Sequence, residues 1–429
     1  MKFSSLSAWL GWLEQSHPKE IDLGLDRIRA VAARLDLLKP KARVITVAGT
    51  NGKGSCVTAT ASLLHAAQFS VGVYTSPHLL HYAERIQISG KPVDDDVICA
   101  AFEEISSAAD EISLTYFEYG TLAALLIFKQ QAVDYIVLEV GLGGRLDAVN
   151  IINADVAVIT SIAIDHQEWL GDNREVIGRE KAGILREQQI FVCADENPTQ
   201  TIVDIAKQLN TKSYFIDRDF SFHQHEKKWQ WQGKNQLGGA VSLLDMQVPH
   251  LPLPSLAAAL QVIQLLDVKL GQSNIETALL NINLAGRFQK IIFKEREFIL
   301  DVAHNPAATE YFFKRLVADP ARGQTFAIVA MMSDKDRLAS LANLTSVVDH
   351  WLLLDLKANP RATTVAALTK DLLSLGEHVL ESGDINKLIE TALSKTQPQD
   401  RILVFGSFFT VGAALSYLQA DSHISRGMQ

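Results

Sequence analysis

The sequence has little of several features that would place it in a specialised class. Its three cysteines lie far apart without metal-ligand spacing, which excludes a disulfide framework and suits a reducing compartment. No apolar run approaches the length of a membrane span, and the first residues lack the small-residue cleavage site of a signal peptide. We therefore expect a cytoplasmic protein that neither crosses nor requires a membrane.

Positive charge is also scarce. The formal net charge of −9 argues against nucleic acid as the main partner, so an anionic ligand would need a local basic pocket. No G-x-G-x-x-G motif follows a candidate strand, and no N-K-x-D motif is present. These absences exclude the dinucleotide fingerprint and the guanine-recognition motif of GTPases.

What is present predicts a two-domain α/β protein. A chain of 429 residues exceeds what one core usually serves. Apolar strand candidates alternate with amphipathic helices, which favours mainly parallel sheets covered by helices. We predict a doubly wound, P-loop ATPase-like domain over 1–284, a linker over 285–290, and a smaller Rossmann-like α/β domain over 291–429. The principal predicted strands are Val71–Tyr74, Tyr135–Val140, Asp155–Ile162, Phe298–Val302, Phe326–Ala330, Trp351–Asp355 and Ile402–Phe405, and the predicted helices include Tyr119–Gln131, Pro252–Leu266 and one that begins after Asp94–Asp96.

The stretch Val44–Ser55, VITVAGTNGKGS, is the most specific local signal. Its apolar half is typical of a buried parallel strand, and its glycines let backbone N–H groups converge on an anion. Lys53 can then reach phosphate oxygens, and Ser55 can serve a metal ion or a phosphate. The general P-loop pattern has a glycine where Val47 stands and a hydroxyl residue directly after the lysine, where Gly54 stands. The motif is therefore a P-loop of a narrower kind, and a glycine turn without ligand is the alternative.

Further polar residues follow other predicted strands, at the sheet edge where open α/β sheets bind ligands. Glu139 ends one strand and precedes a glycine-rich run. A carboxylate beside a P-loop commonly holds Mg²⁺ against the phosphates, whereas the alternative is a solvent-facing acid. His166 follows Asp165 at another strand end and is either a ligand or a structural histidine.

Together these motifs resemble the folylpolyglutamate synthase family, and within it the bacterial bifunctional dihydrofolate synthase/folylpolyglutamate synthases, which are related to the Mur amino-acid ligases. The resemblance extends over nearly the whole chain, and the runs EVGLGGRLDA and DVAHNP are its most specific parts. It is carried by Gly49–Ser55, Ser76-Pro77-His78, Tyr116-Phe117-Glu118, Glu139–Asp147, Asp165-His166, Glu180–Ile184, Gly286-Arg287-Phe288 and Asp301–Pro306.

The resemblance implies roles for these residues. The catalytic residues would be Lys53, Glu139, His166 and Lys181, with Lys181 carbamylated. Magnesium, at two sites, would be held by Ser76, Glu139 and His166. ATP would be bound by Gly49, Thr50, Asn51, Gly52, Lys53, Gly54, Ser55, Arg287, Asp301 and His304. Ser255 stands where the family usually has asparagine, before the helix near Leu256.

The same resemblance implies a pocket for a pterin-bearing substrate, in which an aromatic ring stacks on the heterocycle and carboxylates pair with ring N–H groups. Its residues would be Asp22, Leu23, Gly24, Leu25, Thr115, Tyr116, Phe117, Glu118, Leu146, Asp147 and Ala148. Such a pocket favours the bifunctional enzyme, with dihydropteroate, folates and L-glutamate as substrates.

The expected reaction is ATP-dependent ligation of L-glutamate through an acyl phosphate, by a monomer. Three alternatives remain: a folylpolyglutamate synthase alone, a Mur-type ligase with a nucleotide-sugar substrate, and a P-loop switch protein. Only 48 residues precede Gly49, which we expect to be too few for the separate substrate domain of nucleotide-sugar ligases.

Overall fold

The chain divides into two compact units, Met1–Ile282 and Asn283–Gln429. The structure is a computed structural model, and it describes residues 2–19 and 21–426. The predicted linker, 285–290, falls at the start of the second unit, where Gln289 and Lys290 already belong to a strand. Among the described helices, none is both long enough and apolar enough to cross a membrane.

The first unit is built on a sheet whose strands run mainly parallel, in the order β4-β3-β2-β5-β1-β6-β7-β8, with β3 and β4 antiparallel at one edge. Val44 to Ala48 of β1 are buried on both faces, as a central parallel strand requires. The strands are β1 (Arg43–Ala48), β2 (Val71–Tyr74), β3 (Ile86–Ile88), β4 (Lys91–Pro92), β5 (Tyr135–Glu139), β6 (Val156–Ile159), β7 (Ile190–Cys193) and β8 (Lys212–Phe215).

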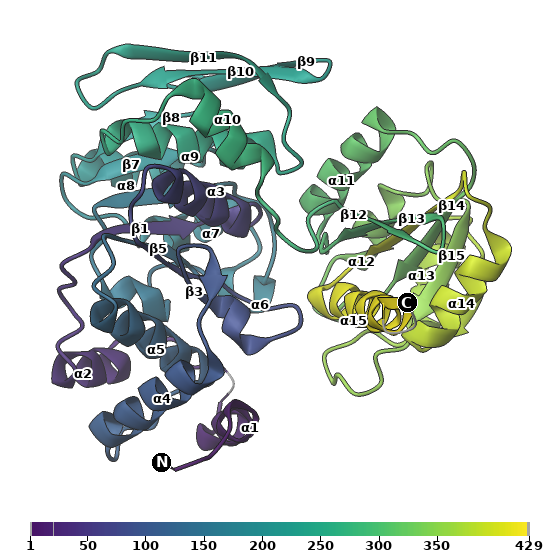
Figure 1. Ribbon diagram of the computed structural model, residues 1–429, viewed down its shortest axis with the longest axis horizontal. Coiled ribbons are helices and arrows are strands. Elements are labelled where there is room, and N and C mark those ends of the chain that lie inside the picture. The colour runs from purple at the N-terminus through teal and green to yellow at the C-terminus, as the bar shows by residue number, and fades with distance from the viewer. Residues whose placement is uncertain (1, 20, 427–429) are drawn as a thin grey trace. The chain divides into compact units, whose positions relative to one another are not determined.

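Helices cover this sheet, as Figure 1 shows for α3, α5 and α9. Apolar residues of α1, α2, α4 and α5, among other helices, pack with the strands into one large core. The helices up to β8 are α1 (Leu6–Ser16), α2 (Asp26–Arg34), α3 (Lys53–Ala66), η1 (Tyr82–Arg85), α4 (Asp95–Ala109), α5 (Tyr116–Gln130), η2 (Ala148–Ile151), α6 (Gln167–Leu170), α7 (Arg174–Ala182) and α8 (Gln200–Gln208).

A polar, tryptophan-rich segment forms a small antiparallel sheet of β9 (Ser221–His225), β10 (Lys228–Lys234) and β11 (Ala240–Gln247). The buried Trp229 and Trp231 anchor this sheet, and the indole N–H of Trp231 donates to the carbonyl of Ala257 at 3.1 Å. Ala257 lies in α9 (Leu253–Leu265), which packs against α3 and is followed by α10 (Gln272–Leu280). Figure 1 shows this sheet at the outer side of α9 and α10.

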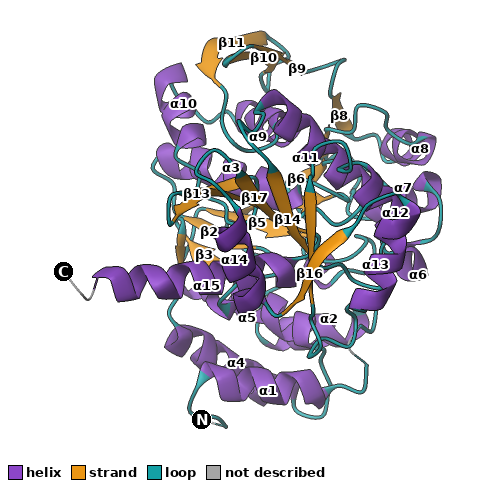
Figure 2. Cartoon of the chain, turned by 90° about the vertical axis from the view of Figure 1, so that its right-hand side faces the viewer, coloured by secondary structure: helices purple, strands orange, loops and turns teal. Residues whose placement is uncertain are grey.

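The second unit is a smaller α/β domain with strand order β12-β13-β17-β14-β15-β16, in which only β12 pairs antiparallel among the described strands. Helices flank its strands (Figure 2). Its elements are β12 (Gln289–Phe293), β13 (Arg296–Asp301), α11 (Pro306–Ala318), β14 (Thr325–Val329), α12 (Arg337–Ala342), β15 (His350–Leu354), α13 (Val365–Ser374), β16 (Val379–Gly383), α14 (Ile385–Lys395), β17 (Arg401–Phe405) and α15 (Phe408–Arg426).

The predicted fold class is confirmed, and the differences are local. Helix α5 begins at Tyr116, three residues before the predicted start, because Thr115 and Glu118 form a capping box. Asp94 occupies the N-cap position of α4, but its side chain makes no capping hydrogen bond. Strand β6 ends at Ile159. The N–H of Thr160 still donates to the carbonyl of Ala48 at 2.9 Å, while the hydroxyls of Thr160 and Ser161 contact the loop after β1.

Candidate active site

The loop after β1 requires glycine at two positions. Gly49 has a φ of +149°, and a Cβ atom there would lie 1.8 Å from the Oγ1 atom of Thr160. Gly52 has a φ of +85° and is the N-cap residue of α3. These glycines let the chain turn sharply from strand to helix. The N–H groups of the first turn of α3 point out of the helix end, which is the arrangement that binds phosphate in P-loops.

Residues that follow β6 hold this loop in place. The hydroxyl of Thr50 donates to the carbonyl of Ala163 at 3.1 Å and accepts from the N–H of Ala163 at 3.0 Å. The N–H of Thr50 donates to the carbonyl of Ser161 at 2.6 Å, and the N–H of Asn51 donates to its Oγ at 3.3 Å. Thr50 and Asn51, both predicted to bind ATP, therefore anchor the loop through these backbone N–H groups.

Two lysine side chains converge on one carbonyl of the loop. Lys53 Nζ donates to the carbonyls of Gly49 and Thr50, each at 3.1 Å. Lys181, near the end of α7, is buried and donates from Nζ to the same Gly49 carbonyl at 2.9 Å. Desolvation, reinforced by the positive charge of Lys53, lowers the pKa of Lys181 to about 7. At neutral pH a large fraction of this side chain is therefore an uncharged amine.

The glycine-rich run after β5 packs against the end of α7. A Cβ atom at Gly144 would lie 2.8 Å from the carbonyl oxygen of Glu180, and one at Gly183 would lie 2.5 Å from the Cα atom of Arg145. The N–H of Arg145 donates to the carbonyl of Glu180 at 2.8 Å, and its guanidinium pairs with the carboxylate of Glu180 at 3.0 Å. This close packing places Lys181 under the loop.

Oxygen atoms suited to a hard metal ion lie on neighbouring elements. Glu139 ends β5, opposite Val47 of β1, is 5% exposed, and accepts from the N–H of Ser76 at 3.2 Å. Ser55, in the first turn of α3, is 1% exposed, and its hydroxyl finds no hydrogen-bond partner among the described residues. The buried hydroxyl and the buried carboxylate, carried by the neighbouring elements α3 and β5, are of the oxygen type that Mg²⁺ prefers as a ligand.

His166 precedes the short helix α6 with a φ of +51°, and its N–H donates to the carboxylate of Asp165 at 2.8 Å. Within residues 2–19 and 21–426, no three or more His, Cys, Asp or Glu side chains gather as a metal cluster. The predicted set contains two side chains of these types and the serine hydroxyl of Ser76, so its metal-binding role stays a prediction.

One part of the predicted pterin site is a chain of charged groups that joins α2 to α5. Arg27 pairs with Asp22 at 2.6 Å and with the buried Glu118 at 3.3 Å. Glu118 also accepts from the N–H of Thr115 at 2.7 Å. Asp22 and Glu118 thus already have cationic partners, while the predicted Leu23, Gly24 and Leu25 precede α2 and Tyr116 opens α5.

The other part surrounds an aromatic ring. The Phe117 ring lies so close to Gly141 that a Cβ atom there would be 2.6 Å from it, and its centroid is 5.8 Å from that of Tyr74. Asp147, between Leu146 and Ala148, accepts from the N–H groups of Leu142 at 2.8 Å and Val149 at 3.0 Å. Desolvation raises the pKa of Asp147 to about 6, against the effect of these hydrogen bonds.

In the second unit, the predicted residues gather where β13 ends. Asp301 accepts from the N–H groups of Phe288 at 2.8 Å and Ala303 at 2.9 Å, and desolvation raises its pKa. Arg287 lies over the ring of Phe408 at 5.1 Å, and the ring of His304 lies 6.4 Å from the same ring. Phe408 was absent from the predicted set because nothing in its local sequence indicates this contact.

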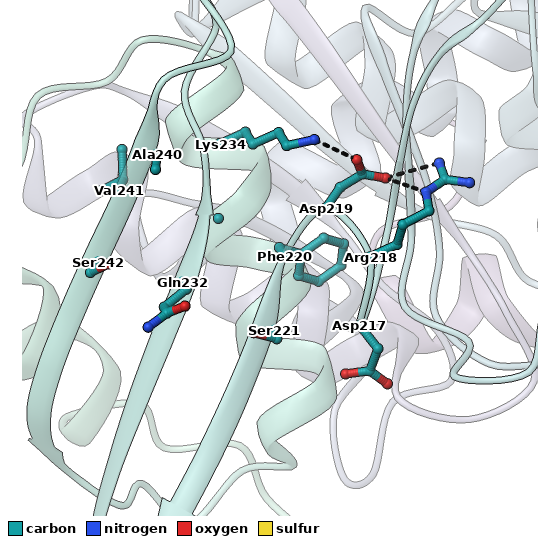
Figure 3. A pocket seen from close by; sticks show the side chains of 11 residues that line it. Asp217, Arg218, Asp219, Phe220, Ser221, Gln232, Lys234, Ala240, Val241 and Ser242 are labelled. Carbon is teal, nitrogen blue, oxygen red and sulfur yellow. Dashed lines mark hydrogen bonds and ion pairs between the residues drawn. The ribbon is translucent and has the colours of Figure 1, made fainter.

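A cavity of about 230 Å³ lies elsewhere in the first unit (Figure 3). At its edge Asp219 accepts from Lys234 at 2.7 Å and from Arg218 at 2.9 Å, so one carboxylate is shared by two cations. None of the predicted site residues lines this cavity.

A glycine loop with a lysine at the end of a parallel strand, beside a strand-end carboxylate, defines a P-loop nucleotide-binding protein. Residues 47–248 match the family model of the Mur ligase middle domain, and residues 286–408 match that of the Mur ligase, glutamate ligase domain.

Known proteins resemble the chain over nearly its whole length. The dihydrofolate synthase/folylpolyglutamate synthase of Escherichia coli is 42% identical over 419 residues, which cover 97% of this chain and 96% of that protein. The structure of E. coli FolC in complex with DHPP and ADP has a TM-score of 0.92 and 42% identity, covering 98% of this chain and 99% of its own. A bifunctional folylpolyglutamate synthase/dihydrofolate synthase crystallised with Mn, AMPPNP and L-glutamate has a TM-score of 0.89 and 42% identity, covering 97% and 98%. The chain therefore belongs to the dihydrofolate synthase/folylpolyglutamate synthase family of ATP-dependent Mur ligases.

Proposed function

We propose that this enzyme joins L-glutamate to dihydropteroate and further glutamates to tetrahydrofolate, at the expense of ATP. The observation that carries the proposal is the loop after β1, where α3 begins and where Lys53 and the buried Lys181 both donate to the carbonyl of Gly49. The E. coli relative whose structure contains DHPP and ADP supports the same substrates here. A folylpolyglutamate synthase alone is the second candidate, favoured by the two carboxylates of the pterin site that already have a cationic partner.

The reaction first joins a carboxylate to a phosphate group and then releases inorganic phosphate. A substrate carboxylate attacks the γ-phosphate of ATP, which forms an acyl phosphate and ADP. The amine of L-glutamate then attacks the acyl carbon and releases phosphate. Lys53 and the N–H groups of the first turn of α3 reduce the repulsion between carboxylate and phosphate.

The proposed metal ligands are Ser76, Glu139 and His166. Mg²⁺, when bound, supplies positive charge against the phosphate oxygens. The related crystal structure with Mn and AMPPNP supports a divalent ion in this role, and we retain two sites as the proposal. Arg287, Asp301 and His304 are proposed to contact ATP from the second unit.

We further propose that Lys181 is carbamylated. Its neutral amine adds CO₂, which gives a carbamate and releases one proton. The product is an anionic carboxylate close to Lys53, and its nitrogen keeps one hydrogen for the carbonyl of Gly49. The lowered pKa supports this proposal because only the unprotonated amine is a nucleophile.

We place the enzyme in the cytoplasm as a monomer, without a nucleic-acid or membrane partner. The three cysteines are buried and form no disulfide bond, which fits a reducing compartment. The net charge of −9 gives no support to nucleic-acid binding.

The test is ADP release, measured with each acceptor and with or without L-glutamate. We expect glutamate-dependent turnover with dihydropteroate and with tetrahydrofolate, and its loss in Lys53→Ala. Glutamate-dependent turnover with tetrahydrofolate but not with dihydropteroate would favour the second candidate, a folylpolyglutamate synthase alone. ADP release that does not depend on any pterin substrate would contradict the proposal.

A further inference from the structure

A serine far from the loop in sequence contacts the point where the loop becomes a helix. Ser255 lies in the first turn of α9, is 4% exposed, and its hydroxyl donates to the carbonyl of Gly52 at 3.1 Å. A Cβ atom at Gly52 would lie only 2.6 Å from this hydroxyl, so the two residues are tightly apposed. Helices α3 and α9 pack along each other, and this packing holds Ser255 next to Gly52.

The Gly52 carbonyl determines where an anion-binding N–H points. The carbonyl of Gly52 and the N–H of Lys53 belong to one planar trans peptide, so they point in opposite directions. When the Gly52 carbonyl is held toward α9, the N–H of Lys53 must therefore point away from α9. This N–H is the first one of helix α3. The same carbonyl also accepts from the N–H of Cys56 at 3.0 Å, so the Ser255 hydroxyl is its second donor.

The preceding peptide is held in the same way from another element. The carbonyl of Asn51 accepts from the Oγ1 atom of Thr160 at 2.7 Å and from the Oγ atom of Ser161 at 3.1 Å. That carbonyl shares a peptide plane with the N–H of Gly52. Hydroxyls from two sides thus set consecutive N–H groups, and Ser255 supplies the one that holds the Gly52 carbonyl from α9.

We propose that Ser255 is a positioning residue that aims the first N–H group of α3 at the phosphates of the nucleotide, rather than a residue that contacts the nucleotide itself. The short serine side chain reaches the loop carbonyl directly, from the first turn of α9. This inference rests on the proposed binding of ATP by the loop.

The test compares phosphate-dependent and phosphate-independent affinity in Ser255→Ala. Loss of one hydrogen bond that orients a binding group should reduce the affinity for ATP and for ADP by about three- to tenfold. The affinity for AMP, which lacks the β- and γ-phosphates, should stay unchanged. Ser62→Ala is the matched control, because the Ser62 hydroxyl on α3 donates to the carbonyl of Ala278 at the same 3.1 Å but away from the loop. That control should leave all three affinities unchanged, with thermal unfolding recorded for both variants.

The possible outcomes separate this inference from the proposed function. Unchanged ATP affinity in Ser255→Ala, with weakened affinity in Lys53→Ala, would overturn the inference and leave the ATP site intact. An equal loss for AMP and ATP would also overturn it, because it would indicate direct contact with the nucleoside. Unchanged ATP affinity in Lys53→Ala would instead reject the proposed ATP site.

Discussion

The buried Lys181 gives the sharpest prediction, namely that activity depends on CO₂. Only the neutral amine can add CO₂, and falling pH protonates it. With a pKa of about 7, the amine is mostly neutral above pH 7 and mostly charged below it. The capacity for carbamylation should therefore rise as pH increases through 7, at fixed dissolved CO₂.

The size of the expected effect follows from the lowered pKa of Lys181. At pH 8 a lysine of pKa about 7 is roughly 90% neutral, whereas one near 10.5 is only about 0.3% neutral. The burial of Lys181 therefore provides a roughly 300-fold larger neutral fraction than ordinary solvation would. Between pH 6 and pH 8 the neutral fraction should increase about tenfold.

The assay measures glutamate-dependent ADP release after equilibration in CO₂-free buffer. We expect low activity, recovery when bicarbonate is added, and a pH midpoint of recovery near 7. Isotope-labelled bicarbonate should give one carbamate NMR signal that is absent in Lys181→Ala. Lys181→Arg keeps the charge but cannot add CO₂ in this way, so it should stay inactive with or without bicarbonate.

Replacement of the exposed Lys39 by alanine is the control for a general effect of removing a lysine, and it should behave as the wild type. Undiminished glutamate-dependent ADP release in Lys181→Ala would remove this residue from the mechanism. Full activity in CO₂-free buffer would leave the amine, and not the carbamate, as the working form.

Three further substitutions test other parts of the site. Glu139→Gln keeps an acceptor for the N–H of Ser76 but loses the charge, so the Mg²⁺ concentration for half-maximal turnover should rise about ten- to a hundredfold. Phe117→Ala should raise KM for dihydropteroate roughly tenfold and leave KM for ATP unchanged; a rise in both would refute stacking. Gly49→Ala forces a Cβ atom against Thr160, and the thermal midpoint should fall by roughly 3–10 °C while ATP binding is lost.

The sequence predicts the strand-end motifs well because each motif is local. Val44 to Ala48 form a buried strand, and Gly49 and Gly52 meet a steric requirement of the turn. The physical cause in each case lies within a few residues of the feature. The predicted fold class follows from the alternation of such segments.

The contacts that support the loop could not be predicted in this way. The hydrogen bond from Ser255 to Gly52 joins residues 203 positions apart, and it depends on how α9 packs against α3. The burial of Lys181 depends on the packing of Arg145 against Glu180 and Gly183. Thr160 and Ser161 lie inside the predicted strand Asp155–Ile162, but the observed strand β6 already ends at Ile159.

The charges around the loop also imply an order of events. Lys53 and Lys181 donate to the same carbonyl, and the positive charge of Lys53 helps to keep Lys181 neutral. Phosphates beside Lys53 would offset that charge, raise the pKa of Lys181 and leave less neutral amine for CO₂. CO₂ addition should therefore be faster before the nucleotide binds than after it. Bicarbonate-dependent recovery should be slower when magnesium-free ADP is bound beforehand, and an unchanged rate would show that the phosphates do not act on Lys181.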